Sequence, residues 1–240
     1  MPHNRFFVDT SFTLDSHLTL PEEESYHIIK VMRLQVGESF ELINGKGFLA
    51  EAKLESIGKK DLVCSISKLS FTEKPKNPWI IAQAFLKPSS LELLVEKNTE
   101  LGMDQLWLFP AYYSEKSDLS SNQEKRLYAH RVSAIKQCGR LYLPTIRLFD
   151  SLEKLCEVAT KTSSHLFYGD IDPKAPKLLS CLYNKQLLTP PIFFIGPEQG
   201  FYKKEELLLK KFNVQAVSLN PNILRAETAS MTASALLAHI

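Results

Sequence analysis

The sequence predicts an α/β protein in two parts, a small and mostly β domain over residues 1–72 and a larger domain over residues 73–240. Three observations support this division. Short strand-like segments and a hairpin turn dominate the first part. From Trp79 onward, strand-like and helix-like segments alternate, which is typical of a mostly parallel sheet covered on both faces. Between the parts, residues 72–78 are polar and contain two prolines, as expected for an interdomain linker.

The hairpin of the first part is predicted at Asn44–Gly47, because strand-like residues 40–43 and 48–52 flank it. A third strand is predicted over residues 62–66. A helix is expected within residues 21–33, where acidic residues fill the first turn and basic residues the last, as the helix dipole favours. Several short strands and one helix together indicate a small barrel-like domain.

The larger part is predicted to hold six strands joined by helices. The strands are expected near residues 79–86, 105–109, 145–149, 165–168, 192–195 and 214–219. A helix should end at Gly102, a residue common just after helix C-termini. A basic helix is expected over residues 123–139. A further helix is expected over residues 202–212. The C-terminal helix is rich in Ala and Ser, which would allow close backbone packing.

Composition sets limits on function. The net charge is +2, and residues 1–72 carry 8 basic and 10 acidic side chains, so a role with RNA has to depend on local patches. No apolar run approaches the roughly 20 residues that span a bilayer. The N-terminus also lacks the apolar segment of a signal peptide, so a cytoplasmic location is expected. The four cysteines show no C-x-x-C spacing, which favours reduced thiols over a zinc site or disulfides.

One candidate binding loop follows the strand at residues 192–195. The strand stops at Gly196-Pro197-Glu198, and Gly200 precedes a segment with helical potential. The two glycines permit positive φ angles and close approach of a ligand. Turns at the carboxyl ends of strands in α/β sheets are common ligand sites. An ordinary strand-to-helix turn is the alternative interpretation.

A second candidate loop precedes the C-terminal helix. A short strand over residues 214–219 meets the turn Asn220-Pro221-Asn222. A charged helix start follows, with Arg225, Glu227 and Thr228.

Together, Ile195-Gly196-Pro197-Glu198-x-Gly200-Phe201 and Ile223-Leu224-Arg225-x-Glu227-Thr228-Ala229 resemble the C-terminal signature of the bacterial 16S ribosomal RNA (uracil-N3) methyltransferases, members of the SPOUT superfamily. Further matches cover essentially the whole chain. They are His27-x-x-Lys30-Val31-Met32-Arg33-Leu34, Lys97-x-Thr99-Glu100-Leu101-Gly102, Ser114-Glu115-Lys116-Ser117 and Gln137-x-Gly139-Arg140.

The resemblance implies a SPOUT-type parallel sheet with a C-terminal trefoil knot, preceded by a PUA/OB-like β-barrel domain that binds RNA. It implies a homodimer that uses S-adenosyl-L-methionine to methylate N3 of a uridine in the 16S rRNA of the small ribosomal subunit, with no metal. The implied cofactor residues are Phe167, Ile195, Gly196, Pro197, Gly200, Leu219, Ile223 and Leu224. The implied RNA-binding residues are Arg5, His27, Lys30, Arg33, Ser114, Lys116, Gln137 and Arg140.

Three charged residues are candidates for catalysis. Uridine N3–H is a weak acid, so attack is helped by removing its proton or by stabilising the anion that forms. Arg225 suits a phosphate or a developing negative charge. Glu198 and Glu227 are candidates for orientation or proton acceptance. The alternatives are an ion pair of Arg225 with one of these glutamates, and a simple helix-dipole role for Glu227.

The chain departs from the family pattern at the two loops. Gln199 stands where the family has Gly, and Leu219-Asn220-Pro221-Asn222 replaces Leu-Gly-x-Arg. Lys87-Pro88 replaces Lys-Gly. An RNA-binding assembly factor with a degenerate cofactor loop is therefore one alternative, and a small-molecule α/β enzyme with an accessory barrel is another. A third possibility to weigh is that the basic side chains at 27, 30 and 33 merely face solvent.

Overall fold

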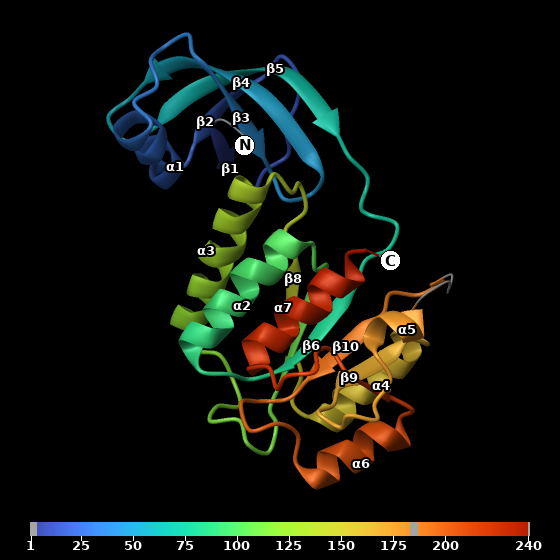
Figure 1. Cartoon of the computed structure of the whole chain (residues 1–240). Helices are drawn as coiled ribbons and strands as arrows, with labels where there is room; N and C mark the ends of the chain where they lie inside the picture. The colour runs from blue at the N-terminus through green and yellow to red at the C-terminus, as the bar shows by residue number, and fades with distance from the viewer. Residues whose placement is uncertain (1–3, 183–186, 240) are drawn as a thin grey trace. The chain divides into compact units, whose positions relative to one another are not determined.

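The computed structural model describes residues 4–182 and 187–239 (Figure 1). The chain divides into two compact units. The first comprises Met1–Lys74 and Val132–Leu143, and the second comprises Pro75–Arg131 and Pro144–Ile240. The helix α3 (Ser121–Cys138) therefore begins in the second unit and ends in the first. The sequence, by contrast, predicts a single boundary near residue 72.

The first unit is built on a five-stranded sheet in the order β1-β3-β4-β5-β2. The strands are β1 (Arg5–Phe7), β2 (His17–Leu20), β3 (Ser39–Ile43), β4 (Phe48–Ile57) and β5 (Leu62–Phe71). Only the β1–β3 pair is parallel. The two long strands β4 and β5 curve (Figure 1), and their pairing shifts register between Glu51 and Ala52 and between Leu54 and Ser56. Such irregularities bend a sheet around its core, which here includes Phe6, Leu42 and Leu62.

The predicted hairpin turn is confirmed between β3 and β4. The Asn44 side-chain oxygen accepts hydrogen bonds from the Lys46 and Phe48 N–H groups at 2.9 and 3.3 Å. Gly45 and Gly47 have φ angles of +70° and +94°. The turn also pairs with the segment after α3, since Gly47 N–H donates to the Leu141 carbonyl at 3.0 Å. This pairing explains why residues 132–143 cluster with the first unit.

The predicted helix within residues 21–33 differs from a regular α-helix. It consists of α1 (Glu22–Tyr26) followed by a π-helical turn, η1 (His27–Val31). Met32 N–H bonds to the His27 carbonyl, which closes a turn of five residues. Ile28 is fully buried, whereas Tyr26 and Val31 are 63% and 56% exposed. Isolated π-turns are frequent at functional sites.

The second unit contains a six-stranded sheet in the order β11-β9-β10-β6-β7-β8, and every strand pair is parallel. The strands are β6 (Ile80–Ala84), β7 (Gln105–Phe109), β8 (Thr145–Leu148), β9 (Leu166–Gly169), β10 (Ile192–Ile195) and β11 (Gln215–Val217). All residues of the central strands β6 and β10 are buried. The parallel sheet of the sequence analysis is confirmed.

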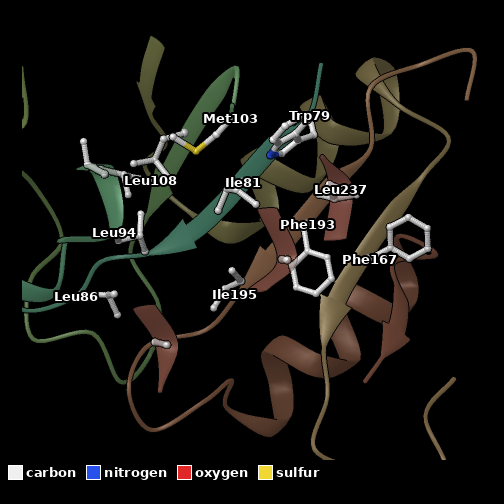
Figure 2. Close-up of a cluster of buried hydrophobic side chains, with 14 of the residues drawn as sticks. Trp79, Ile81, Leu86, Leu94, Met103, Leu108, Phe167, Phe193, Ile195 and Leu237 are labelled. Atoms are coloured by element: carbon white, nitrogen blue, oxygen red, sulfur yellow. The ribbon is translucent and has the colours of Figure 1, made fainter. Parts of the chain in front are cut away.

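Helices cover both faces of this sheet. They are α2 (Pro88–Leu101), α3, α4 (Leu152–Thr162), α5 (Leu178–Leu182), α6 (Lys203–Lys211) and α7 (Ala226–Leu237). Successive strand residues point to opposite faces, so Ile81 and Phe193 enter the core beneath α2 and α7. Figure 2 shows these two side chains in that core with Leu237. Ile80 and Phe194 enter the other core, beneath α4 and α6.

The small residues of α7 pack within the chain. α7 lies against α2, and its Ser230 and Ser234 are fully buried. The Asn98 amide donates to Ser230 Oγ at 2.8 Å, and the Trp79 indole N–H donates to Ser234 Oγ at 3.2 Å. Short side chains allow this close approach, and their hydroxyls accept hydrogen bonds from the buried Asn98 amide and Trp79 indole. The trefoil knot and the homodimer stay predictions.

Candidate functional site

A cavity of about 310 Å³ lies at the carboxyl ends of β9, β10 and β11. Three loops form its wall, over residues 168–171, 195–201 and 219–224. Glu206 of α6 and Ala226 and Ala229 of α7 complete the lining. Parallel strands present their carboxyl ends at one edge of a sheet, where α/β proteins commonly bind ligands. The volume is within the range of small-molecule sites.

Two glycines shape the loop after β10. The Gly200 N–H bonds to the Pro197 carbonyl at 2.9 Å and closes the turn. A Cβ atom on Gly196 would lie 3.0 Å from backbone atoms of Gly200 and Phe201, so this position cannot carry a side chain without backbone movement. Gly200 has a φ of +78° and open space where its Cβ would be. The predicted glycine roles, a tight turn and an open approach, therefore fit the geometry.

A buried amide fixes where this loop starts. Gln83, in the central strand β6, is fully buried. Its amide N–H groups donate to the carbonyls of Gly196 at 3.0 Å and Ala84 at 3.1 Å. Its Oε1 atom has no hydrogen-bond partner among the described residues. The two donated hydrogen bonds hold the Gly196 and Ala84 carbonyls in place and offset the cost of the unpaired buried acceptor.

The charged residues that line the cavity are all acidic. They are Asp170, Glu198 and Glu206, and no Lys, Arg or His is among the lining residues. The Tyr168 hydroxyl lies 3.5 Å from Asp170 Oδ2. Burial, followed by the charges of Asp170 and Glu206, raises the pKa of Tyr168 to about 12. The phenol is thus a hydrogen-bond donor at neutral pH, and the cavity electrostatically favours a cationic ligand.

Seven of the eight predicted cofactor residues line this cavity. They are Ile195, Gly196, Pro197, Gly200, Leu219, Ile223 and Leu224. Ile223 is 80% exposed and therefore lies at the rim. Phe167 is instead a core residue beside Phe193 (Figure 2), and the next residue, Tyr168, is the one that lines the cavity. Alternation along β9 explains this, because Phe167 and Tyr168 point to opposite faces of the sheet.

The loop that departs from the family pattern is closed by its own side chains. Asn220 Oδ1 accepts a hydrogen bond from Asn222 N–H at 2.9 Å, an Asx turn. Ser218 Oγ donates to the Asn220 carbonyl at 3.3 Å. Asn220, Pro221 and Asn222 line the cavity, as does Gln199. A turn stabilised in this way does not need the glycine that the family has here.

The three catalytic candidates lie in different surroundings. Arg225 is the exposed N-cap residue of α7, between the cavity-lining residues Leu224 and Ala226. Among the described residues Arg225 has no ion-pair partner, so the expected alternative of a pair with Glu198 or Glu227 is not formed. Glu198 lines the cavity, and its Oε1 accepts from Lys87 N–H at 3.2 Å. Glu227 is half-buried in the first turn of α7, where a carboxylate is favoured by the dipole.

Most of the predicted RNA-binding residues belong to the first unit. Arg5 is only 10% exposed and pairs with Glu41 at 2.7 Å. His27 packs edge-on against Phe6, with ring centroids 5.6 Å apart. Lys30 and Arg33 are exposed on and after η1.

Gln137 and Arg140 are also in this unit, at the end of α3 and in the segment after it. Gln137 is exposed, whereas Arg140 is half-buried.

The other two RNA candidates lie in the second unit, after β7. Ser114 Oγ donates to the Phe85 carbonyl at 3.0 Å and accepts from Ala111 N–H at 3.3 Å. Its hydroxyl therefore holds the loop in place. Lys116 is exposed.

Over residues 4–182 and 187–239, no group of three His, Cys, Asp or Glu side chains is arranged to hold a metal ion. In the same ranges no helix combines the length and apolar character needed to cross a membrane. Cys64, Cys156 and Cys181 are buried free thiols, and Cys138 is an exposed one.

Fold and cavity together define an α/β protein with a small-molecule site at the carboxyl edge of a parallel sheet. Residues 72–238 match the family model of the RNA methyltransferase domain, and residues 20–67 match that of the RNA methyltransferase PUA domain. The chain therefore belongs to the RNA methyltransferase family, and its fold is of the SPOUT type with a PUA-like N-terminal domain.

Named relatives align over nearly the whole chain. The Rickettsia conorii protein named ribosomal RNA small subunit methyltransferase E is 28% identical, over 98% of this chain and 95% of its own. The Buchnera aphidicola protein of the same name is 26% identical, over 95% and 90%. The crystal structure of the Neisseria gonorrhoeae enzyme of this name, bound to S-adenosyl methionine, superposes with a TM-score of 0.84 at 24% identity, covering 98% of this chain and 95% of that one.

Proposed function

We propose that this protein methylates N3 of a uridine in the 16S rRNA of the small ribosomal subunit, with S-adenosyl-L-methionine as the methyl donor. The observation that carries the proposal is the cavity at the ends of β9, β10 and β11, located in a domain of the RNA methyltransferase family. The names of the relatives support ribosomal RNA of the small subunit as the substrate. The N3 position is what the resemblance of the two C-terminal motifs implies.

The residues of the cavity suit this donor. S-adenosyl-L-methionine bears a sulfonium and an ammonium group, and when bound it would supply an electrophilic methyl group. Asp170, Glu198 and Glu206 give the cavity the opposite charge. Apolar Ile195 and Leu224 provide surface for an adenine ring. The open space at Gly200 leaves the backbone accessible to the ligand.

The chain's own residues can assist attack by the uridine. The guanidinium of Arg225 has no ion-pair partner among the described residues, and so it is available to a phosphate or to the uridine anion. Of the two glutamates, Glu198 is the stronger candidate for accepting the N3 proton, because it lines the cavity. Glu227 is assigned an orienting role at the start of α7.

RNA binding is assigned to the first unit together with Ser114 and Lys116 of the second. In the first unit, half-buried His27 begins the π-turn, and the exposed Lys30 and Arg33 lie on and after it, where we assign them to a basic face that meets RNA. Arg5, already paired with Glu41, is the weakest member of the predicted set. We infer further that the enzyme is a knotted homodimer in the cytoplasm, where its substrate is assembled. Sedimentation of the purified protein tests the dimer.

The non-catalytic alternative, an assembly factor with a degenerate loop, is not favoured. Gln199 and Asn220–Asn222 line an open cavity instead of filling it. A small-molecule enzyme is disfavoured by the match of residues 20–67 to an RNA methyltransferase PUA domain.

The experiment begins with calorimetric titration of S-adenosyl-L-methionine into the protein, and we expect micromolar binding. Small subunits from a strain that lacks the modification are then incubated with enzyme and donor, and their nucleosides are analysed by mass spectrometry. Appearance of 3-methyluridine is the expected result. Donor binding without any methylated nucleoside, on both free 16S rRNA and assembled subunits, would contradict the proposal.

A further inference from the structure

Three tyrosine rings form a compact group in the second unit, which we call the tyrosine cluster: Tyr112, Tyr113 and Tyr202. The rings of Tyr112 and Tyr202 are stacked, with centroids 4.4 Å apart and planes at 21°. Tyr113 meets both edge-on, with centroids at 5.0 and 6.0 Å. Despite these contacts, Tyr112 is 67% exposed. Aromatic residues that only support a fold are generally buried.

A single carboxylate holds the cluster together. Glu205 Oε1 accepts a hydrogen bond from Tyr112 N–H, and Oε2 accepts one from Tyr202 N–H, both at 2.9 Å. The loop after β7 is thereby joined to the start of α6. Ser114 anchors the same loop to the end of β6 through the Phe85 carbonyl. The rings are therefore pre-positioned, so little conformational entropy is lost when a ligand binds them.

The cluster adjoins the wall of the cavity. Tyr202 directly follows Phe201, which lines the cavity. Phe201 stacks on Phe109 at the end of β7, with centroids 6.4 Å apart and planes at 5°. The strands β10, β6 and β7 are neighbours in the parallel sheet, and their carboxyl ends lie at one edge. A polymer whose target residue reaches the rim of the cavity can therefore lay adjacent residues on the tyrosines.

The charges beside the cluster favour a polyanion. Lys203 and Lys204 follow Tyr202, and Lys116 follows Tyr113 by three positions; all three are exposed. None of the three has an ion-pair partner among the residues that the structure describes. Two of the nearby acids are already engaged, Glu205 by two N–H groups and Glu115 by Lys87 at 3.4 Å, whereas Glu206 lines the cavity.

We propose that the tyrosine cluster is a stacking platform for unpaired RNA bases next to the target nucleotide, with Lys116, Lys203 and Lys204 contacting the flanking phosphates. The proposal rests on the proposed function, because it takes RNA as the substrate. Stacking on aromatic rings combined with basic side chains is how proteins hold single-stranded nucleic acid, and it requires no particular base.

The test uses the full-length protein and two fluorescent probes of about 12 nucleotides. One is oligouridylate, and the other is an oligomer of the same length and phosphate number in which abasic residues replace the uridines. Tyr112→Ala should weaken oligouridylate binding about tenfold and leave the abasic probe unaffected. Tyr112→Phe should bind as the wild type does. Changing Lys203 and Lys204 together to Ala should weaken binding of both probes.

Leu207→Ala is the matched control, because Leu207 is a 58% exposed apolar residue on α6 outside the cluster. It should change neither affinity. Thermal unfolding of each variant verifies the fold. If Tyr112→Ala unfolds, Tyr112→Leu takes its place, and it should show the same selective loss of oligouridylate binding because it lacks an aromatic ring. Equal affinity of Tyr112→Ala and wild type for oligouridylate overturns the proposal. The proposal is also overturned if Tyr112→Ala changes the oligomeric state, as measured by sedimentation, while oligouridylate binding is retained.

Failure of the platform and failure of the proposed function give different results. If Tyr112→Ala binds oligouridylate normally while the wild type methylates small subunits, only the platform is wrong. If the wild type does not methylate but Tyr112→Ala selectively loses oligouridylate binding, the platform stands without the proposed reaction.

Discussion

The side-chain amide of Gln83 donates a 3.0 Å hydrogen bond to the carbonyl of Gly196, across 113 residues of sequence. This bond joins the central strand β6 to the first residue after β10, within the cavity loop. Gln83→Leu replaces the amide with an apolar side chain of similar size and leaves the Gly196 carbonyl without this donor. We expect a loss of about 1–3 kcal/mol in the free energy of unfolding, together with weaker S-adenosyl-L-methionine binding by calorimetry.

The control for this variant is Asn98→Leu, which removes the other buried amide with an unpartnered oxygen. Asn98 bonds to Ser230 in the α2–α7 contact and does not line the cavity. It should lose comparable stability and keep full donor affinity. Equal donor affinities for the two variants would mean that Gln83 does not position the loop.

Gly200→Ala tests whether the open space at Gly200 belongs to the ligand. Its φ of +78° makes any Cβ cost about 1 kcal/mol. Gly37→Ala is matched, because Gly37 has a φ of +95° and equally open surroundings but lies in the first unit. Both variants should unfold at similar denaturant concentrations. Only Gly200→Ala should weaken donor binding, by about tenfold, and a normal dissociation constant would place the ligand elsewhere in the cavity.

Arg225→Ala should abolish methylation without unfolding the protein. The residue is exposed and lacks an ion-pair partner among the described residues, so the midpoint of thermal unfolding should stay unchanged. Removing an electrostatic stabiliser of this kind lowers kcat by about 100-fold or more. Arg126→Ala, which removes an exposed arginine paired with Glu92, is the control and should remain active. Full activity of Arg225→Ala would exclude Arg225 from the reaction.

The basic face of the first unit can be tested by salt dependence. Changing Lys30 and Arg33 together to Gln should weaken binding of 16S rRNA and reduce the slope of log affinity against log salt by about 1.4, the value for two lost phosphate contacts on single-stranded RNA. Donor binding should not change. Lys59 and Lys60, two exposed lysines between β4 and β5, provide an equal charge change when altered to Gln. An unchanged slope for the first pair would mean that it only faces solvent.

Tyr168 makes a prediction about alkaline pH. Its pKa is raised to about 12 in the folded protein, above the ordinary value of 10.0. Between these two values the folded state retains a proton that the unfolded state has released, so stability falls as the pH rises. The contribution of Tyr168 to the free energy of unfolding is fully present below pH 10 and is lost as the pH rises towards 12. Urea unfolding from pH 9 to 11.5 should show a smaller decline for Tyr168→Phe than for the wild type. Parallel declines would show that Tyr168 is not a source of alkaline instability.

Much of the parallel sheet could be predicted because its strands are short apolar runs between helical segments. β7 and β10 were predicted at their observed residues. The edge strand β2 was missed, since His17 and Thr19 are exposed and its apolar signal is weak. The helix within residues 21–33 was predicted as regular, because periodicity alone does not distinguish a π-turn from an α-helical one.

In the cavity, the sequence identified the residues that have special backbone properties. Gly196, Pro197 and Gly200 are recognisable because glycine permits close backbone approach and unusual φ angles, and proline fixes one backbone angle. The acidic lining residues Asp170 and Glu206 were missed, as charged residues after a strand or on a helix are ordinary. Gln83 did give a signal, an amide within an apolar strand, but nothing in the sequence indicated its partner.

The sequence by itself determined most of the strands, the hairpin turn and the two candidate loops at residues 196–200 and 220–222, because each depends on interactions among residues a few positions apart. Only the tertiary structure decided that three loops enclose one acidic cavity, that residues 132–143 join the first unit, and that Glu205 ties Tyr112 to Tyr202. These contacts join segments tens of residues apart in the sequence. They form when the strands align in the sheet order, and no local pattern of residues encodes that order.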